Sequence, residues 1–99
     1  QLDRAFASID VLDEVVSAID GKAEVYVDSG VRRGADVATA LAMGADAVFI
    51  GRPLGLALAV GGERGVAHAL ELVAAELRIT MALLGATSVG GLQRRMVDP

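Results

Sequence analysis

Two short apolar runs of the sequence each end in glycine and arginine. "VYVD" is followed by Ser29, Gly30 and Arg32, and "AVFI" is followed by Gly51 and Arg52. Glycine lets backbone N–H groups approach an anion without a Cβ in the way, and a guanidinium can grip two phosphate oxygens at once. Two such loops favour a phosphate-binding site. The alternative is that the glycines only form turns and the arginines are solvated.

An acidic residue stands beside the first loop. Asp28 ends the first apolar run, where its carboxylate could accept a hydrogen bond from a sugar-like hydroxyl. Its alternative role is structural, either capping the next turn or pairing with Arg32. We expect Arg33 to face solvent, because two adjacent side chains rarely converge on one anion.

Strands and helices must bring the two loops together. Their alternation predicts parallel β/α units, in which ligands gather at the carboxyl ends of the strands. The apolar spacing predicts these elements in chain order: a helix at 9–19 that Ser8 or Asp10 can cap, a strand at 23–28, a helix at 35–43, a strand at 47–50, a short helix from Pro53 that Gly61 and Gly62 end, a long helix at 63–84, and a short helix or turn within 89–96.

The second predicted strand bears on how much of a fold the sequence contains. Residues 47–50 show no polar alternation, which is typical of a strand buried on both faces of a parallel sheet. Two strands alone would leave unpaired edges. We therefore expect the 99 residues to be the closing part of something larger, and to be poorly folded or associated with its remainder.

Composition excludes several classes of function. A net charge of −4 and an aromatic content of 3% argue against nucleic acid or an anionic membrane as a partner. The absence of cysteine excludes disulfides and thiolate metal sites, and no other metal-ligand spacing is evident. We expect no membrane-spanning run and no signal peptide, which leaves the cytoplasm as the default location. The single histidine, His68, is expected on a partly exposed helix position, and Met43 and Met81 are expected to pack.

These motifs resemble the FMN-dependent 2-hydroxy acid oxidase and dehydrogenase family, which includes glycolate oxidase, lactate oxidase, flavocytochrome b2 and mandelate-oxidising enzymes. The family carries Asp-Gly-Gly-(Val/Ile)-Arg-x-Gly-x-Asp-(Val/Ile), followed by Ala-Leu-(Gly)-Ala and Gly-Arg-Pro. The corresponding stretches here are "DSGVRRGADV", "ALAMGADAVFIGRP" and, further on, "ELRITMALLGATSV". The resemblance runs through almost the whole chain.

The resemblance implies a fold and a cofactor. The fold is α/β, the C-terminal portion of a TIM (β/α)8 barrel with its last two strands and their helices, and residues 1–99 would be one segment of that barrel. Ser29 stands where the family usually has glycine, so we expect a negative φ there if serine is to fit. By resemblance the FMN phosphate site comprises Gly30, Arg32, Gly51 and Arg52, with Ser29 in the same loop and Asp28 holding a ribityl hydroxyl.

The resemblance also implies an activity. Gln1-Leu2-Asp3 matches the end of the family motif His-Gly-(Gly/Ala)-Arg-Gln-Leu-Asp, so the catalytic histidine and arginine are expected upstream of Gln1, with no catalytic residue in this segment. The reaction would oxidise a 2-hydroxy acid, with a faint preference for a mandelate-like one, to a 2-oxo acid, with oxygen or another acceptor reoxidising the flavin. A tetramer-like homo-oligomer is the expected assembly.

Two other readings stay open. One is a different FMN barrel, such as type 2 isopentenyl diphosphate isomerase or a relative of inosine monophosphate dehydrogenase, although "QLD" and "MALLG" count against it. The other is a non-catalytic half-barrel module that binds a phosphorylated ligand or assembles with a partner chain.

Overall fold

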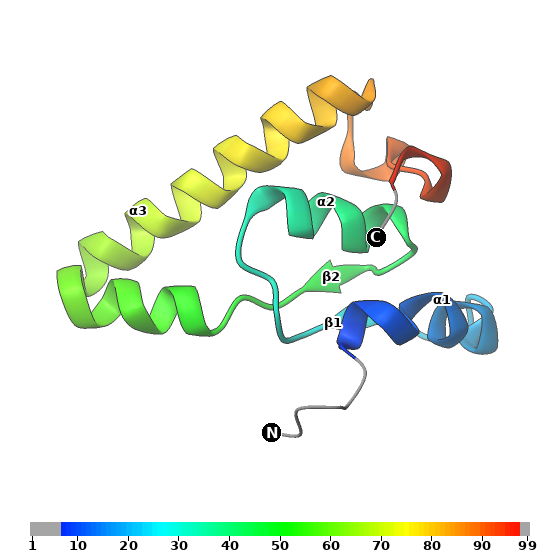
Figure 1. Cartoon of the computed structure of the whole chain (residues 1–99), viewed down its shortest axis with the longest axis horizontal. Helices are drawn as coiled ribbons and strands as arrows, with labels where there is room; N and C mark the ends of the chain where they lie inside the picture. Colours follow the sequence, from blue (N-terminus) through cyan, green and yellow to red (C-terminus); the bar gives the residue numbers. More distant parts are fainter. Residues whose placement is uncertain (1–6, 98–99) are drawn as a thin grey trace.

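The computed structural model describes residues 7–97, in which helices and short strands alternate (Figure 1). This order confirms the predicted α/β alternation. In chain order the elements are α1 (Ser8–Ile19), β1 (Tyr26–Val27), α2 (Gly34–Ala42), β2 (Ala47–Val48), α3 (Arg52–Leu84) and the 3-10 turns η1 (Val89–Gly91) and η2 (Arg94–Met96).

The two strands pair in parallel, with Tyr26 opposite Ala47 and Val27 opposite Val48. Beyond this ladder, the Phe49 N–H donates to the Val27 carbonyl oxygen at 2.8 Å. At the other end the Asp46 side chain accepts a hydrogen bond from the Val25 N–H, also at 2.8 Å. Both strands are shorter than predicted, because within residues 7–97 each has only one neighbouring strand to pair with.

Helices α1 and α2 cover one face of the strand pair. Val25 and Val27 are buried there against Leu12 of α1 and against Val37 and Ala40 of α2. Apolar residues recur at regular spacing along α1 and α2 and form the side of each helix that packs on the strands. This explains why both helices form close to the predicted positions.

The opposite face of the strand pair is open. It carries Tyr26 and Phe49, which are 53% and 54% exposed, with ring centroids 5.7 Å apart in an edge-to-face arrangement. The Tyr26 hydroxyl donates to the Glu24 carboxylate, and this hydrogen bond raises the pKa of Tyr26. The expectation that residues 47–50 are buried on both faces is therefore wrong for this chain, because no described residue covers the second face.

Helix α3 consists of two arms. Gly62 has φ 60° and ψ −146°, which interrupts the helix and turns its direction (Figure 1). Glycine adopts such a conformation readily because it has no Cβ. The kink confirms the predicted break at Gly61–Gly62, and the helix ends at Leu84 as predicted, with Gly85 in the left-handed conformation at φ 80°.

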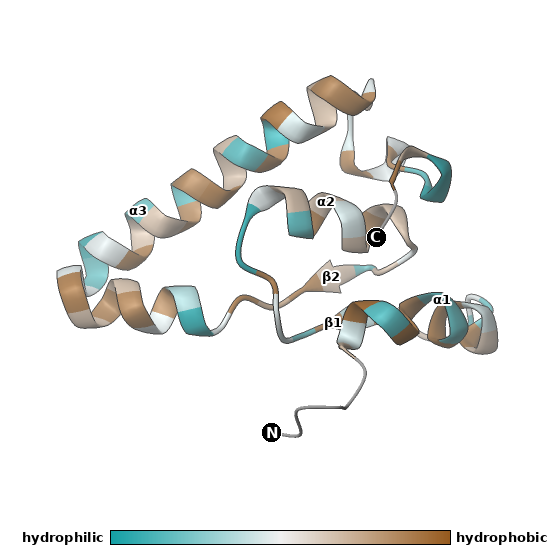
Figure 2. Ribbon diagram, viewed as in Figure 1, coloured by the Kyte–Doolittle hydropathy of each residue, from teal (hydrophilic) through white to brown (hydrophobic). Residues whose placement is uncertain are grey.

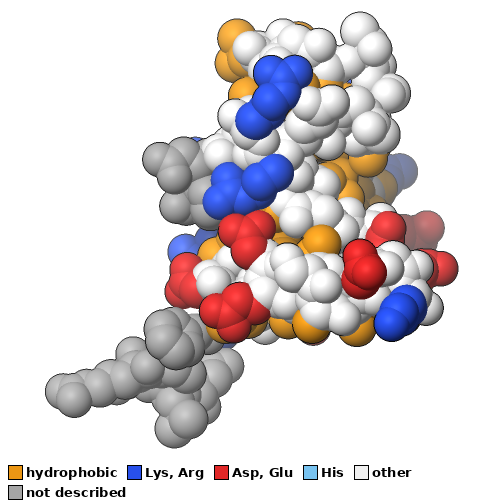
Figure 3. All heavy atoms as spheres, turned by 90° about the vertical axis from the view of Figure 1, so that its right-hand side faces the viewer, with side chains coloured by type: hydrophobic (Ala, Val, Ile, Leu, Met, Phe, Trp, Pro, Cys, Tyr) orange, Lys and Arg blue, Asp and Glu red, His pale blue; other side chains and the backbone are white. Residues whose placement is uncertain are grey.

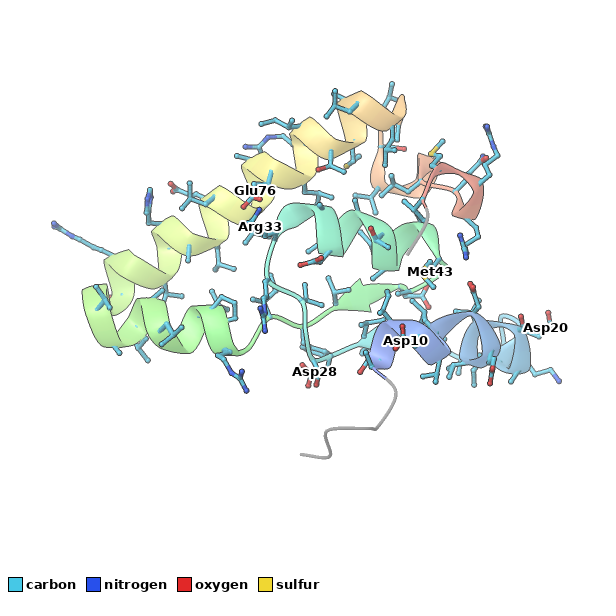
Figure 4. All side chains as sticks on the ribbon, in the orientation of Figure 1. Asp10, Asp20, Asp28, Arg33, Met43 and Glu76 are labelled. Atoms are coloured by element: carbon cyan, nitrogen blue, oxygen red, sulfur yellow. The ribbon has the colours of Figure 1, made fainter. Side chains whose placement is uncertain are left out.

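The second arm of α3 packs against α2, on the side of α2 away from the strands (Figure 1). Val73 and Leu77 border the main core, and Met81 is buried beside Ala38 and Ala42. Met43 is also buried, as predicted, and lies at the end of α2 (Figure 4). His68 is exposed on the same arm, which is the predicted outcome.

Apolar residues also lie on the outer side of α3 (Figure 2). Val60 is 91% exposed and Leu83 is 83% exposed. By length and composition alone, the segment Arg52–Gly91 could cross a membrane. An 18-residue stretch of it has a mean hydropathy of 1.5, and 11% of that stretch is buried. The expectation that no segment is long and apolar enough to span a membrane is therefore wrong by this criterion. The Gly, Glu and Arg residues that interrupt the apolar runs lower the mean hydropathy too little. The kink and the charges of Glu71 and Arg78 are poorly suited to a bilayer core.

The C-terminal turns are fastened to α1 by Arg94. Its guanidinium donates to the Asp13 carboxylate at 3.2 Å and to the Val97 carbonyl oxygen at 2.9 Å. Figure 3 views this side of the molecule, where basic side chains lie above acidic ones. Both partners are about half exposed, so the pair adds less than about 1 kcal/mol to stability and mainly orients the turn.

Close packing of α2 on α3 predicts the effect of a single added methyl group. A Cβ on Gly34 would lie 2.6 Å from the carbonyl carbon of Glu76 and closer still to the Leu77 nitrogen. We expect Gly34→Ala to lower the free energy of unfolding by about 1–3 kcal/mol, because backbone cannot yield as a side-chain end can. Thermal or denaturant unfolding of the intact protein measures this.

The control is Gly55→Ala in the first arm of α3, where a Cβ would meet nothing within 4 Å. Gly55→Ala should stabilise the helix by about 0.5–1 kcal/mol. Equal effects of the two variants would contradict this account of the α2–α3 contact.

Candidate anion-binding site

The loops after β1 and β2 line one cavity of about 290 Å³. They meet because parallel strands present their carboxyl ends at the same edge of a sheet. The structure brings all six predicted site residues together there, along with three others. The lining residues are Asp28, Ser29, Gly30, Val31, Arg32, Phe49, Gly51, Arg52 and Pro53.

Helix α3 directs its N-terminus at this cavity. Gly51 is the N-cap, Arg52 the first helical residue and Pro53 the second, one position later than predicted. No side chain among residues 7–97 caps this helix. The N–H groups of its first turn lack carbonyl partners within the helix, and the helix dipole adds partial positive charge at this end. An anion in the cavity would therefore meet unpaired donors.

The other two helices begin differently. At α1 the Asp10 carboxylate accepts the Ala7 N–H at 3.1 Å, so Asp10 rather than Ser8 fulfils the predicted capping role. At α2 the Asp36 carboxylate accepts the N–H groups of Arg32 and Arg33, at 3.0 and 3.1 Å. Each acid places negative charge in the first turn of its helix, where it would repel an anion. Among residues 7–97, α3 is the α-helix that begins without an acid in its first turn.

Asp36 also fixes the first glycine–arginine loop. Its two hydrogen bonds hold the backbone on either side of the Arg32–Arg33 peptide to the start of α2. Sequence reasoning missed this residue. The signal that could have found it is an acid three residues after the helix N-cap, the position from which a carboxylate reaches back to backbone N–H groups.

The two glycines leave open space on the cavity side. A Cβ on Gly30 or Gly51 would meet nothing within 4 Å, so a ligand can approach the backbone at both positions. Gly30 also has φ 76°, a conformation that side chains disfavour. Phe49 and Val31 were not predicted as lining residues. Phe49 could have been found from strand alternation, because it lies two residues before Gly51 and so points to the same side.

Ser29 differs from the expectation. Its φ is 79°, in the left-handed region, whereas we expected a negative value if serine were to fit. A non-glycine residue in this region costs about 1–2 kcal/mol. The Asp28 carboxylate accepts the Ser29 N–H at 2.8 Å, which holds the turn in this conformation. Asp28 thus has the local structural role that was the alternative for it, with its second oxygen still available.

The charges around the cavity favour an anion. Arg32 and Arg52 are both exposed, and Arg94–Asp13 is the only ion pair within residues 7–97. Asp28 is the one acid that lines the cavity. Arg33 is exposed, as predicted, and does not line the cavity. It lies near Glu76 of α3 (Figure 4).

The two strands are parallel, and each is followed by a loop that lines the cavity and by a helix, which places the chain in the α/β class. The sequence family agrees with this class. The model of the FMN-dependent dehydrogenase family matches residues 1–99, and the chain belongs to that family.

Individual relatives cover almost all of this chain but little of their own length. The chain is 54% identical to L-lactate oxidase of Nostoc sp. over 89 residues, which are 90% of this chain and 24% of that protein. It is 50% identical to 2-hydroxyacid oxidase 1 of Homo sapiens over 97 residues, 98% of this chain and 26% of that protein. The chain thus spans about a quarter of the length of these relatives.

Solved structures of mandelate oxidase are similar in fold. One, a variant with a monooxide FMN adduct, gives a TM-score of 0.88 at 50% sequence identity and covers 95% of this chain and 30% of that chain. Another, mandelate oxidase with benzoyl-formic acid, gives the same TM-score and identity and covers 28% of that chain.

The hydrogen bonds of Asp36 predict a measurable loosening of the loop. Asp36→Ala removes the acceptor of the Arg32 and Arg33 N–H groups, so these amides should exchange with solvent faster, and stability should fall by about 1 kcal/mol. Hydrogen exchange and denaturant unfolding of the intact protein measure the two effects.

Asp10→Ala is the matched control, because Asp10 holds the start of α1 in the same way but lies outside the cavity lining. Asp10→Ala should cost similar stability without changing exchange in the loop. If both variants leave loop exchange unchanged, Asp36 does not fix the loop.

Proposed function

We propose that residues 1–99 form the C-terminal segment of one FMN-binding TIM barrel, with β1 and β2 as its last two strands. Membership of the FMN-dependent dehydrogenase family supports this proposal. So do the two β/α units, because in each a strand is followed by a glycine–arginine loop and a helix. The exposed Tyr26 and Phe49 are suited to the interior of a closed barrel, where layers of side chains fill the centre.

The observation that carries the proposal is the shared cavity. Two guanidinium groups, two glycines with open space above the backbone and the uncapped N-terminus of α3 line it together. This donor set fits a phosphate monoester, which needs several N–H donors and positive charge. At about 290 Å³ the cavity is at the small end of ligand sites, suited to the phosphate end of FMN.

Each of the six predicted site residues has a proposed task. Arg32 and Arg52 hold the phosphate oxygens, and Gly30, Gly51 and the Ser29 backbone let the chain come close to them. Asp28 keeps one oxygen on the Ser29 N–H, which orients its carboxylate. Its other oxygen accepts a hydrogen bond from a ribityl hydroxyl.

The reaction we propose is oxidation of a small 2-hydroxy acid to the 2-oxo acid. When bound, FMN supplies the acceptor for the hydride that leaves the α-carbon. This segment binds and orients the cofactor, and the groups that remove the hydroxyl proton and hold the substrate carboxylate belong to another part of the protein. Lactate, glycolate and mandelate oxidases are its relatives, so an acid of this class is the proposed substrate.

Replacement of Arg32 tests the cofactor site. Arg32→Ala should weaken FMN binding by about 1.5–3 kcal/mol, because a charged hydrogen-bond partner of the phosphate is lost. Titration of the apoprotein with FMN, followed by flavin fluorescence, measures the dissociation constant. Arg33→Ala is the matched control, since this neighbouring arginine does not line the cavity. Unchanged affinity in Arg32→Ala would refute the phosphate assignment.

The reaction class is tested with the intact protein. We expect a flavin absorbance spectrum that bleaches when mandelate, lactate or glycolate is added without oxygen, because the electrons of the acid then stay on the flavin. A bound flavin that no 2-hydroxy acid bleaches would favour a different FMN barrel. A protein without flavin would favour a non-catalytic module that binds another phosphorylated ligand.

A further inference from the structure

The segment after α3 is not tied to the rest of the fold by backbone hydrogen bonds. Residues 87–97, here called the C-terminal strap, leave the end of α3 and run past α2 to α1 (Figure 1). The bonded backbone N–H groups of the strap are those of Gly91, Leu92, Met96 and Val97. Each donates to the carbonyl oxygen three residues earlier, inside the strap itself. Within residues 7–97, side chains alone therefore hold the strap in place.

Few apolar side chains anchor the strap. Leu92 is its one buried residue, 8% exposed, and it packs with Ala38 and Ala42 of α2. Met96 and Val97 are partly buried beside the same cluster, and Val97 also borders the main core. A segment with so little buried apolar surface and only local backbone bonds is expected to open locally at a low free energy.

Arg94 connects this weakly anchored segment to α1. Its Nε and Nη2 donate to the two carboxylate oxygens of Asp13, at 3.2 Å each, and its Nη1 donates to the Val97 carbonyl oxygen at 2.9 Å. The Val97 N–H in turn donates to the Arg94 carbonyl oxygen, so the same residue closes the turn and holds it to α1. Within residues 7–97, no other hydrogen bond joins α1 to another helix, strand or turn element. A lysine ammonium lacks the planar fork that this arrangement uses.

The charged neighbours of this ion pair take no part in it. Arg95 donates through Nε to the Gln93 side-chain oxygen at 2.7 Å, which lies in the strap itself. Glu14 follows Asp13 on α1 and is exposed, but Arg94 bonds to Asp13 instead. Arg95 and Glu14 therefore offer matched controls for the two partners of the ion pair.

We propose that the C-terminal strap opens and closes as one unit while α2 and α3 stay folded, with the Arg94–Asp13 ion pair favouring the closed state. Opening exposes the side of α2 that Leu92 covers. Because the ion pair is about half exposed, dissolved salt screens it, and the open population should rise with ionic strength. The inference goes beyond the proposed function and does not depend on the cofactor, so its failure would leave that function untouched.

Proteolysis of the native, intact protein with trypsin measures the opening. Trypsin cleaves after arginine, and cleavage after Arg94 or Arg95 requires the strap to open, so its rate follows the open population. Arg78 is exposed on α3 and provides an internal reference for the opening of that helix. Mass spectrometry of the fragments assigns each cleavage to its site.

Loss of the acid should open the strap alone. At low salt, Asp13→Asn should raise the rate of cleavage in the strap about three- to fivefold, the upper range for an exposed ion pair, and leave cleavage after Arg78 unchanged. The ratio of variant to wild-type rate should fall toward one in about 1 M NaCl, where the pair is screened in both proteins. This ratio cancels the effect of salt on trypsin itself. Glu14→Gln removes the same charge and should leave both rates near those of the wild type.

The basic partner is tested without a change of charge. Arg94→Lys keeps a trypsin site and a positive charge but loses the fork, so strap cleavage after Arg95 should rise as it does in Asp13→Asn. Arg95→Lys is the matched control and should leave cleavage after Arg94 near the wild-type rate. Unchanged strap cleavage in Asp13→Asn would overturn the role of the ion pair, and so would a ratio that salt does not alter. An equal rise after Arg78 would show that the strap does not open on its own.

Discussion

The parallel register of β1 and β2 is the constraint on which the site depends. With Tyr26 opposite Ala47 and Val27 opposite Val48, the two chains leave the sheet side by side, and their loops face the same space. A slip of one residue would turn Phe49 and Gly51 toward the helices, because side chains alternate between the faces. The ladder is short, so the bond from the Val25 N–H to the Asp46 side chain matters for holding this register.

The three helix starts show how local chemistry reserves one place for a ligand. Asp10 and Asp36 satisfy backbone donors at α1 and α2 and place negative charge there. Helix α3 begins instead with Gly51, Arg52 and Pro53, none of which can accept a hydrogen bond through its side chain. The anion site that we propose at α3 therefore rests on the absence of an acid in its first turn as much as on its arginines.

The helices could be predicted from the sequence, and so could the meeting of six residues at one cavity, whereas particular details could not. Long amphipathic runs predict helices well, and glycine after each apolar run marks the loops. The strands are shorter than predicted, because strand length depends on neighbours that a single run of residues does not reveal. The sign of φ at Ser29 is set by its hydrogen bond to Asp28 and by the following Gly30, a tertiary detail of one turn. The position of Asp36 three residues after the helix N-cap could be recognised in the sequence. That it accepts the N–H groups of both Arg32 and Arg33 became evident only in the structure.

The kink at Gly62 gives the fold a joint with few neighbours. A Cβ on Gly61 or Gly62 would meet nothing within 4 Å, and the interruption of the helix means that the two arms are connected by one peptide turn rather than by a continuous ladder. The arm before it presents donors to the cavity, and the arm after it is anchored on α2. Just beyond the kink, Gly65 of the second arm lies close to the Ala57 carbonyl oxygen of the first arm. Extra residues inserted at the kink would lengthen a surface turn and would have to keep this contact. This turn is therefore a place where an additional loop or an engineered tag could be carried outside the lining of the candidate anion-binding cavity.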